Sequence, residues 1–218
     1  MTPAAPAIRG VVFDMDGVLV DSGAHHREAW RALLHEVGVV PEPDFWRLTI
    51  GRPAEEAVVL LLGQRLSAHE CYRLATRKRD HYVRLAGRGV QPVAGAPAFV
   101  ASIRRHGLPC AVATSASRRD VGRLLRAIGV DDHFAAVVTS EDVIYGKPHP
   151  DVYALAARSI GVDPRACLAF EDSVVGIESA RGAGMTVIGV STAHTAAELV
   201  TAGARSAIDS FEGLAWPM

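Results

Sequence analysis

The sequence predicts an α/β fold, a doubly wound, Rossmann-like parallel sheet core with an inserted α-helical domain. Three observations lead to this prediction. Short apolar segments rich in β-branched residues alternate with helical patterns, glycines or loops close the helices, and residues 23 to about 90 show helical periodicity alone. Continuously apolar strands separated by helices are typical of parallel sheets with both faces covered.

Six segments are expected to form the strands of the sheet. They are Gly10–Asp14, Cys110–Thr114, Ala136–Thr139, Cys167–Glu171, Thr186–Val190 and Ser206–Asp209. The helices expected between these strands include Arg118–Ile128, Val152–Ile160 and Val174–Ala183. Each of the three helices ends at or near a glycine (Gly129, Gly161 and Gly184), a residue that is common just beyond the last turn of a helix.

The segment after the first strand interrupts this alternation and is expected to be purely helical. Its predicted helices are His26–Val37, Pro53–Leu62 and Ala68–Leu85. Pro53 followed by Glu55 and Glu56 suits a helix N-terminus. At that end proline loses no hydrogen bond, and acids meet the positive end of the helix dipole.

The length of the chain allows this insertion to be a domain of its own. With 218 residues, the chain can form one large domain or a core with a smaller second domain. We assign residues 1–20 and 93–218 to the sheet core and residues 21–92 to the helical domain. The segments 21–23 and 87–95 flank the insertion, and their glycine-containing composition predicts hinges.

The composition favours a globular protein without a nucleic-acid or membrane partner. Of the residues, 49% are hydrophobic and 22% are charged, and the net charge of −1 gives no field that would attract nucleic acid or anionic lipid. The basic clusters at 77–79, 104–105 and 118–119 are short and are expected to be solvated helix faces. The longest aliphatic run, Ala57–Leu62, is far short of a membrane span.

The N-terminal residues and the cysteines bear on the compartment. Residues 1–7 lack the charged start and apolar core of a secretion signal. Cys71, Cys110 and Cys167 do not have a metal-binding spacing, and an odd number of cysteines fits reduced thiols. We therefore expect a cytoplasmic protein, with a monomer as the default state.

Polar side chains follow four of the expected strands, at or shortly beyond the point where each strand ends. They are Asp14 and Asp16, Thr114 and Ser115, Lys147 a few residues beyond its strand, and Glu171, Asp172 and Ser173. In an open parallel sheet, the residues just beyond the carboxyl ends of the strands meet at one crevice. The sequence therefore predicts a single site that combines four carboxylates, a hydroxyl group, backbone amides and one lysine.

The charges of this set indicate a divalent metal and a phosphate ligand. Four clustered carboxylates cannot all remain ionised without cations, because like charges at short range raise each other's pKa. Mg²⁺ would add two positive charges to that of Lys147, and it prefers a few hard oxygen ligands that leave room for water and a phosphate. With both cations in place, the Asp14 carboxylate can approach phosphorus in line. Thr114 and the amides of Ser115 and Ala116, expected at a helix start, are suited to hold phosphoryl oxygens.

Each of these residues also has a structural interpretation when it is taken alone. Asp14 or Asp16 alone would fit a turn at a strand end, and Thr114 alone would fit a helix cap. The hydroxyl of Ser115 can cap the helix while its amide binds phosphate. Glu171 has the alternative role of a base that contacts the metal ligands rather than the metal itself, as is often found for one of two adjacent acids. Their occurrence in one set favours the functional interpretation.

Three segments of the chain resemble motifs of the haloacid dehalogenase superfamily, in near-verbatim form. They are Phe13-Asp14-Met15-Asp16-Gly17-Val18-Leu19-Val20-Asp21-Ser22, Gly146-Lys147-Pro148-His149-Pro150-Asp151 and Glu171-Asp172-Ser173-Val174-Val175-Gly176. Together with the loop at Thr114 they follow the order and spacing of the family's four motifs. The resemblance covers the sheet core and implies catalysis through an aspartyl phosphate.

The resemblance also implies a role for each residue of the set. Asp14 is implied to be the nucleophile, and Asp16 the group that protonates the leaving oxygen and then deprotonates the incoming hydroxyl. Thr114, Ser115 and Lys147 are implied to bind the phosphoryl group. The implied ligands of Mg²⁺ are Asp14, Asp16 through its main-chain carbonyl, Glu171 and Asp172.

Asp16 favours phosphate-ester chemistry over the other reactions of the superfamily. Dehalogenases lack an acid at this position because a halide leaves without a proton, and phosphonatases replace it. An alkoxide leaves poorly unless it is protonated, so an acid two residues after the nucleophile suits phosphoryl transfer. A non-catalytic relative that only binds metal or protein would lack at least one of Asp14, Asp16, Lys147 and Asp172, and all four are present.

The inserted segment resembles the helical caps of sugar phosphatases and β-phosphoglucomutases. His26 and Lys78 fall on positions near the general acid and the substrate in the mutase. Arg52 is a third cap residue expected near the substrate, with an exposed arginine at a helix start as the alternative. The mutase has a cap arginine that binds a second phosphate, and aligning on Gly51 places Ala54 there. A mutase needs a firm cation in the cap, because it binds a bisphosphate in two orientations.

We therefore expect a Mg²⁺-dependent phosphatase that hydrolyses a small phosphorylated metabolite, such as a sugar phosphate. A phosphosugar mutase of the β-phosphoglucomutase type is the alternative. The small helical cap favours a metabolite over a protein or nucleic-acid substrate. Closure of this cap is expected to exclude bulk water and to set substrate choice.

Overall fold

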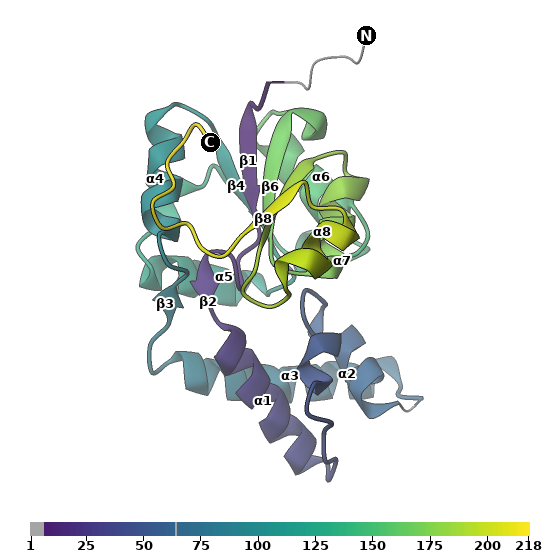
Figure 1. The fold of residues 1–218 in the computed structure, drawn as a ribbon. Coiled ribbons are helices and arrows are strands. Elements are labelled where there is room, and N and C mark those ends of the chain that lie inside the picture. The colour runs from purple at the N-terminus through teal and green to yellow at the C-terminus, as the bar shows by residue number, and fades with distance from the viewer. Residues whose placement is uncertain (1–6, 64) are drawn as a thin grey trace.

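Six parallel strands form one sheet in the computed structural model, which describes residues 7–63 and 65–218. The strand order is β5-β4-β1-β6-β7-β8, which confirms the Rossmann-like α/β fold (Figure 1). The strands are β1 (Gly10–Phe13), β4 (Cys110–Ala113), β5 (Ala136–Val138), β6 (Cys167–Glu171), β7 (Thr186–Val190) and β8 (Ser206–Ile208). Their bounds differ from the expected ones by at most one residue.

The strand order reverses at β1, and this reversal positions the site. The chain adds β4 and β5 on one side of β1 and β6, β7 and β8 on the other. At such a point the loops diverge and leave a crevice at the carboxyl ends of the strands. Phe13, the last residue of β1, lies in register with Val112 of β4 and Phe170 of β6. The loops after these three strands therefore begin at the same level.

Helices cover both faces of the sheet. They are α4 (Ala96–Arg105), α5 (Arg118–Ala127), α6 (Asp151–Ser159), α7 (Val174–Gly182) and α8 (Ala196–Ala202), with the 3₁₀ turns η2 (Asp131–His133), η3 (Ser140–Asp142) and η4 (Pro164–Ala166). α5, α6 and α7 match the expected helices to within one residue at each end. α4 and α8 were not among the expected segments, and α8 is only seven residues long.

Alternation along β1 sends its side chains into two apolar layers. Val11 and Phe13 pack in the layer that contains α4 and α5, and Val12 packs in the layer that contains α6, α7 and α8. The Phe13 ring stacks on Phe170 with the ring centroids 5.1 Å apart. Burial of each such ring contributes about 1.5–3 kcal/mol, so this layer is a main anchor for the loop after β1.

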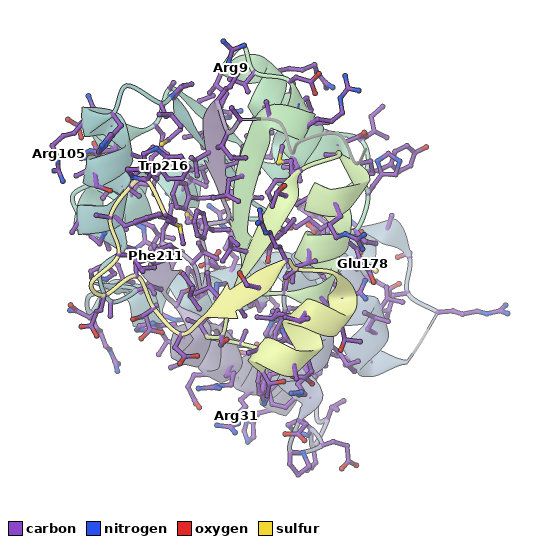
Figure 2. All side chains as sticks on the ribbon, turned by 45° about the horizontal axis from the view of Figure 1, so that its top comes forward. Arg9, Arg31, Arg105, Glu178, Phe211 and Trp216 are labelled. Atoms are coloured by element: carbon purple, nitrogen blue, oxygen red, sulfur yellow. The ribbon has the colours of Figure 1, made fainter. Side chains whose placement is uncertain are left out.

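The C-terminal segment completes the first of these layers. Phe211 is 1% exposed and its ring stacks on Phe99 of α4, with the centroids 5.1 Å apart. The amide of Trp216 donates a hydrogen bond to Ser102 Oγ on the same helix at 2.9 Å. Figure 2 labels Phe211 and Trp216 on this segment beside α4. The end of the chain therefore belongs to the core rather than extending away from it.

The inserted helices lie beyond the carboxyl ends of the strands (Figure 1). They are α1 (Gly23–Glu36), η1 (Phe45–Leu48), α2 (Ala54–Leu62) and α3 (Ala68–Ala86). A short antiparallel pair, β2 (Val20–Asp21) and β3 (Gln91–Pro92), joins the entry and exit of the insertion. The insertion has an apolar cluster of its own that includes Trp30, Leu33 and Phe45. No helix in the described ranges is long and apolar enough to cross a membrane.

Candidate active site

The loops after β1, β4 and β6 and the inserted helices enclose a cavity of about 540 Å³, a size that suits a small metabolite. The predicted core residues that line it are Asp14, Asp16, Thr114, Ser115, Lys147 and Asp172. The predicted cap residues His26, Arg52 and Lys78 line it as well. Glu171 is the exception, since it is fully buried and does not border the cavity.

Lys147 joins two of the predicted carboxylates. Its Nζ donates hydrogen bonds to Asp14 Oδ1 at 2.7 Å and to Glu171 Oε1 at 2.5 Å, and only 1% of its side chain is exposed. Burial lowers the pKa of Lys147, but the charges and hydrogen bonds of Asp14 and Glu171 outweigh burial and raise that pKa above its ordinary value. The lysine is therefore charged throughout the physiological range.

Glu171 is held on its other side by the start of α7. Its Oε2 accepts hydrogen bonds from the amide of Ser173 at 2.8 Å and from the Ser173 hydroxyl at 2.9 Å. A Cβ on Gly176 would lie 1.7 Å from Glu171 Oε1, so only glycine fits at this position of α7. With both oxygens engaged, Glu171 fixes the position of Lys147.

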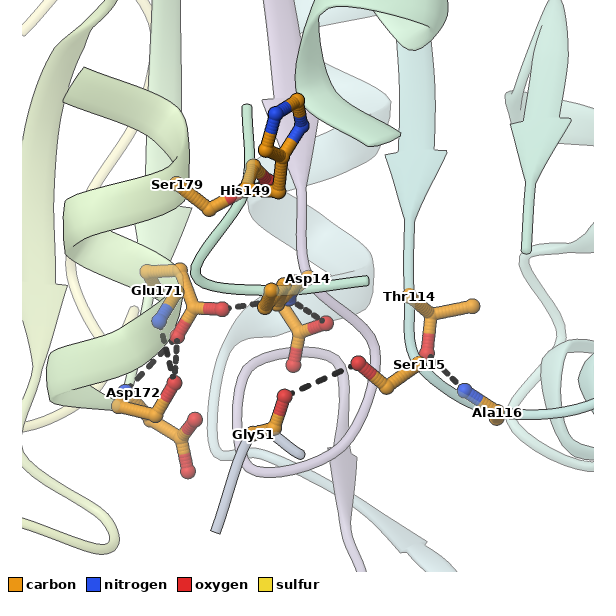
Figure 3. A network of polar contacts seen from close by, with 12 residues as sticks. Asp14, Gly51, Thr114, Ser115, Ala116, His149, Glu171, Asp172 and Ser179 are labelled. Atoms are coloured by element: carbon orange, nitrogen blue, oxygen red, sulfur yellow. Dashed lines mark hydrogen bonds and ion pairs between the residues drawn. The ribbon is translucent and has the colours of Figure 1, made fainter. Parts of the chain in front are cut away.

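Asp14, Glu171 and Asp172 form a buried acidic cluster at the ends of β1 and β6 (Figure 3). One carboxylate oxygen from each residue lies within 4.8 Å of the others. Burial raises the pKa of Asp14 to about 7, with Lys147 opposing the rise and Glu171 adding to it. Burial and the neighbouring acids also raise the pKa of Asp172. Lys147 supplies one positive charge against three acids, so a hard dication such as Mg²⁺ fits this donor set.

Thr192 and Gly17 position Asp172, although neither was in the predicted site. Thr192 Oγ1 donates a hydrogen bond to the Gly17 carbonyl at 2.6 Å and lies 3.3 Å from Asp172 Oδ2. Gly17 has a φ of 77°, and a Cβ there would lie 1.9 Å from the same carboxylate oxygen. Thr192 follows the end of β7, so the strand-end rule that identified the other loops points to this residue too.

Asp16 is linked through His26 to Lys78 of the inserted helices. His26 Nε2 lies 3.2 Å from Asp16 Oδ1, and Lys78 Nζ lies 2.7 Å from His26 Nδ1. Because the lysine can only donate, we assign the proton of a neutral imidazole to Nε2, which then donates to Asp16. The hydroxyl of Ser22 donates to the same Asp16 oxygen at 2.6 Å.

The three linked groups have shifted pKa values. Burial would raise the pKa of Asp16, but His26, the hydrogen bond from Ser22 and the charge of Lys78 together lower it. Burial, followed by the Lys78 charge, lowers the pKa of His26, so its ring is neutral at pH 7. Burial also lowers the pKa of Lys78 to about 8. Lys78 is only 7% exposed, so the expectation of a solvated basic face at residues 77–79 is wrong for this residue, whereas Arg77 is exposed.

Thr114, Ser115 and Ala116 of the loop after β4 line the cavity. The amide of Ala116 donates to Thr114 Oγ1 at 3.1 Å (Figure 3). α5 begins at Arg118, as expected, with Ser117 as its N-cap, so Ser115 and Ala116 lie in the loop directly before the helix. The Ser115 hydroxyl does not cap the helix, because it donates to the carbonyl of Gly51 in the insertion at 2.9 Å.

Further contacts hold the inserted helices against the core. Besides the bond from Ser115, Arg47 of η1 lies 3.0 Å from Glu198 at the start of α8. Arg79 of α3 lies 2.7 Å from Asp120 of α5, with the Asp120 side chain nearly buried. Arg52, two residues before α2, lines the cavity, and its Nη1 lies 4.0 Å from Glu56 Oε2 of that helix. Ala54, which also lines the cavity, contributes no charge. The site is therefore closed by residues from both parts of the chain.

Comparison with known proteins identifies the family. The model of the haloacid dehalogenase-like hydrolases matches residues 8–184. The chain belongs to this family. The superfamily predicted from the motif segments is thereby confirmed, as is the prediction that the chain is an enzyme.

The curated relatives of this haloacid dehalogenase-like hydrolase include a phosphatase and a mutase. The fructose-1-phosphate phosphatase YqaB of Escherichia coli is 31% identical, and the match covers 83% of this chain and 95% of the relative. The β-phosphoglucomutase of Bacillus subtilis is 27% identical, with 84% of this chain and 83% of the relative covered. The fold matches the β-phosphoglucomutase structure from Clostridium difficile with a TM-score of 0.85 at 24% identity, over 96% of this chain and 94% of that one.

Proposed function

We propose that this chain is a Mg²⁺-dependent phosphatase that hydrolyses a small phosphorylated metabolite, such as a sugar phosphate, through an aspartyl phosphate. The observation that carries the proposal is the buried pair of Asp14 and Lys147, 2.7 Å apart, with Asp16 on the same loop and facing the same cavity. A carboxylate nucleophile, a cation for the phosphoryl oxygens and a second acid for the leaving group are what this hydrolysis requires. We further propose residues 21–92 as a cap domain over a core of residues 1–20 and 93–218.

In the proposed reaction Asp14 attacks phosphorus and the leaving oxygen takes a proton from Asp16. Lys147 orients the nucleophile through its bond to Asp14 Oδ1 and, with Thr114 and the amide of Ser115, binds the phosphoryl oxygens. Asp16 then accepts a proton from the water that hydrolyses the aspartyl phosphate. Bound Mg²⁺ supplies positive charge that offsets the repulsion between the carboxylates and a phosphate dianion.

The neighbours of Asp16 suit these two steps. Its lowered pKa leaves it ionised in the free site, which is the form needed to accept a proton from water. For the first step it must carry a proton, and a bound phosphate dianion favours this because a nearby negative charge raises the pKa of a carboxyl group. The link through His26 to Lys78 keeps the carboxylate in place during both steps.

We propose that Asp14 and Asp172 bind Mg²⁺ through their carboxylates and Asp16 through its main-chain carbonyl. Glu171 belongs to the same acidic cluster, but its oxygens are occupied by Lys147 and Ser173, so we assign it the task of positioning Lys147. Asp172→Asn is expected to weaken Mg²⁺ binding by at least about tenfold. Glu171→Gln keeps the size of the side chain and is expected to weaken it less, while lowering kcat through Lys147.

Hydrolysis is favoured over mutase chemistry by the cap side of the cavity. Ala54 lies where a mutase requires a phosphate-binding cation, and Arg52 lies near Glu56, at 4.0 Å. The relative from Escherichia coli is named as a fructose-1-phosphate phosphatase, whereas the relative from Bacillus subtilis is named as a β-phosphoglucomutase. The mutase remains the second candidate function because that relative aligns over most of both chains.

A panel of phosphorylated metabolites with Mg²⁺, assayed for free phosphate and for isomerised hexose phosphate, tests the proposal. Release of phosphate from a monophosphate, lost on chelation and in Asp14→Asn, supports the phosphatase. Glucose 6-phosphate formed from β-glucose 1-phosphate without free phosphate would establish the mutase instead. Glu178→Gln is the matched control, since this exposed acid on α7 lies outside the cavity.

A further inference from the structure

The part of the cavity where α3 meets the start of α5 carries its own carboxylates. Asp120 lines the cavity, is 7% exposed, and its Oδ2 lies 2.7 Å from Arg79 Nε and 2.8 Å from the hydroxyl of Ser117. Glu141 also lines the cavity, and its Oε1 accepts a hydrogen bond from the amide of Arg118 at 3.2 Å. We call Asp120 and Glu141 the acidic end of the cavity.

This acidic end opposes the binding of a second phosphate. The N-terminus of a helix normally favours an anion, but here Glu141 occupies the first amide of α5 and Asp120 lies in its first turn. Arg79, the cation in contact with Asp120, is already paired with it. Among the residues that line the whole cavity, seven are acidic and five are basic, so a dication at Asp14 and Asp172 leaves no surplus positive charge elsewhere.

The same region offers an unused hydrogen-bonding group to a neutral ligand. Tyr82 of α3 lines the cavity and is 4% exposed, and its hydroxyl has no hydrogen-bond partner within the described residues. A buried hydroxyl without a partner is costly, and a hydroxyl group of a ligand would satisfy it. Its ring is held in place by stacking on His26, with the ring centroids 4.2 Å apart.

We infer that Asp120 is a specificity-determining residue that admits monophosphates with an uncharged, hydroxylated remainder and rejects bisphosphates. The physical basis is charge, since a second phosphate near Asp120 and Glu141 would be repelled by their like charges within the cavity. Arg79 moderates this repulsion through its ion pair. The assignment rests on the proposed function, because it names the substrate class of that same site.

The test compares fructose 1-phosphate with fructose 1,6-bisphosphate at saturating Mg²⁺. For the unmodified enzyme we expect kcat/KM to favour the monophosphate by on the order of 100-fold, the range that juxtaposed like charges produce. Asp120→Asn keeps the shape of the side chain and is expected to lower this preference about tenfold, by improving use of the bisphosphate. Arg79→Gln leaves Asp120 unpaired and is expected to raise the preference. Glu178→Gln is the control and should change neither value.

The opposite directions of these two effects separate specificity from a structural role. If the Arg79–Asp120 pair only held the cap closed, both substitutions would lower kcat/KM for both sugars in parallel. An unchanged preference in the two variants would therefore overturn the inference. Tyr82→Phe adds a second readout. It is expected to lower kcat/KM for fructose 1-phosphate and to leave kcat/KM for p-nitrophenyl phosphate, which lacks sugar hydroxyls, unchanged.

A binding measurement keeps this outcome distinct from failure of the proposed function. Dissociation constants of the two fructose phosphates are measured by calorimetry on Mg²⁺-loaded Asp14→Asn, with and without Asp120→Asn. Absence of phosphate release from every compound would refute the phosphatase, yet the ratio of dissociation constants would still decide the role of Asp120. Equal affinity for the mono- and bisphosphate, or no binding of either, would overturn the inference.

Discussion

Two buried lysines face this cavity, and we predict that replacing them has opposite effects on stability. Lys147 lies 2.7 Å from Asp14 and 2.5 Å from Glu171. Lys78 lies 2.7 Å from the neutral ring of His26, and it makes no ion pair with a carboxylate of the described residues. The carboxylates raise the pKa of Lys147, whereas burial lowers the pKa of Lys78 to about 8. The perturbations are Lys147→Met and Lys78→Met, which replace the ammonium-bearing chain by an unbranched apolar chain one atom shorter.

The expected magnitudes follow from these surroundings. Removing one partner of a buried ion pair costs about 3–5 kcal/mol, so Lys147→Met should lower the free energy of unfolding by this amount without Mg²⁺. Lowering the pKa of Lys78 from 10.5 to about 8 makes its charge about 3 kcal/mol less favourable in the folded than in the unfolded chain. The lost contacts with His26 and the ring of Trp30 offset part of this gain. Lys78→Met should therefore range from neutral to about 2 kcal/mol more stable.

The pH dependence of the two effects has opposite signs as well. The raised pKa of Lys147 depends on ionised carboxylates, and the pKa of Asp14 is about 7. The charge of Lys147 therefore stabilises the folded chain fully between about pH 7 and 10.5. A lowered pKa means that the charge of Lys78 costs stability below pH 8, and this cost fades between pH 8 and 10.5. The gain from Lys78→Met should therefore shrink between pH 7 and pH 9.5, while the loss from Lys147→Met should persist.

Urea unfolding followed by tryptophan fluorescence, in the presence of EDTA, measures both effects. Equal m-values across the variants are needed for the comparison, because they show that the same surface is exposed on unfolding. A similar loss of stability in both variants would refute the reasoning, since it would mean that the contacts of Lys78 outweigh the cost of burying its charge. A gain for Lys147→Met would refute it too.

Four further predictions concern other parts of the core. Gly176→Ala should lower the free energy of unfolding by more than about 2 kcal/mol and remove most of the activity, because the new Cβ would clash with the Glu171 carboxylate, which is held by Lys147. In Gly122→Ala the new Cβ in α5 would lie 3.6 Å from the end of the Arg126 side chain, without a clash. The free energy of unfolding should rise by about 0.5–1 kcal/mol in the same assay. Burial raises the pKa of Cys110 to about 12 and that of Cys167 to about 11, so both thiols should resist a disulfide reagent at pH 8 until urea unfolds the chain; rapid native reaction would contradict this. Thr192→Val should weaken Mg²⁺ binding about tenfold in a calorimetric titration, because it removes the contact between the Thr192 hydroxyl and the Asp172 carboxylate. Unchanged affinity would show that this contact does not position Asp172.

The central strands β1, β4 and β6 were predictable because they are buried at every position. Cys167–Glu171 is buried at all five positions, so its sequence is continuously apolar up to the final acid. The pair β2 and β3 was not predictable, since two residues in each strand carry no periodic pattern. β3 lies within the predicted hinge segment 87–95. Its antiparallel pairing with Val20–Asp21 joins that segment to the start of the insertion, and only the folded chain shows this pairing.

The helices of the insertion were predictable from their periodicity, but their exposure was not. Lys78 stands between two arginines in α3, and this basic run by itself predicted a solvated face, although the resemblance to the mutase cap placed Lys78 near the substrate. Packing instead buries Lys78 against Trp30 and directs Arg79 to Asp120. Residues 79 and 120 belong to different parts of the chain, so no local pattern encodes their contact.

By itself, the sequence determined the fold class, the family and the acids, hydroxyl group and lysine that gather at one edge of the sheet. It could do so because these residues directly follow strands or stand in short motifs, and parallel strands bring their ends together. Only the tertiary structure decided that Glu171 turns to Lys147, that Ser115 bonds the insertion, and that Asp120 borders the cavity. Those outcomes depend on contacts between distant segments, where the position of a side chain is set by its partners and not by its neighbours in sequence.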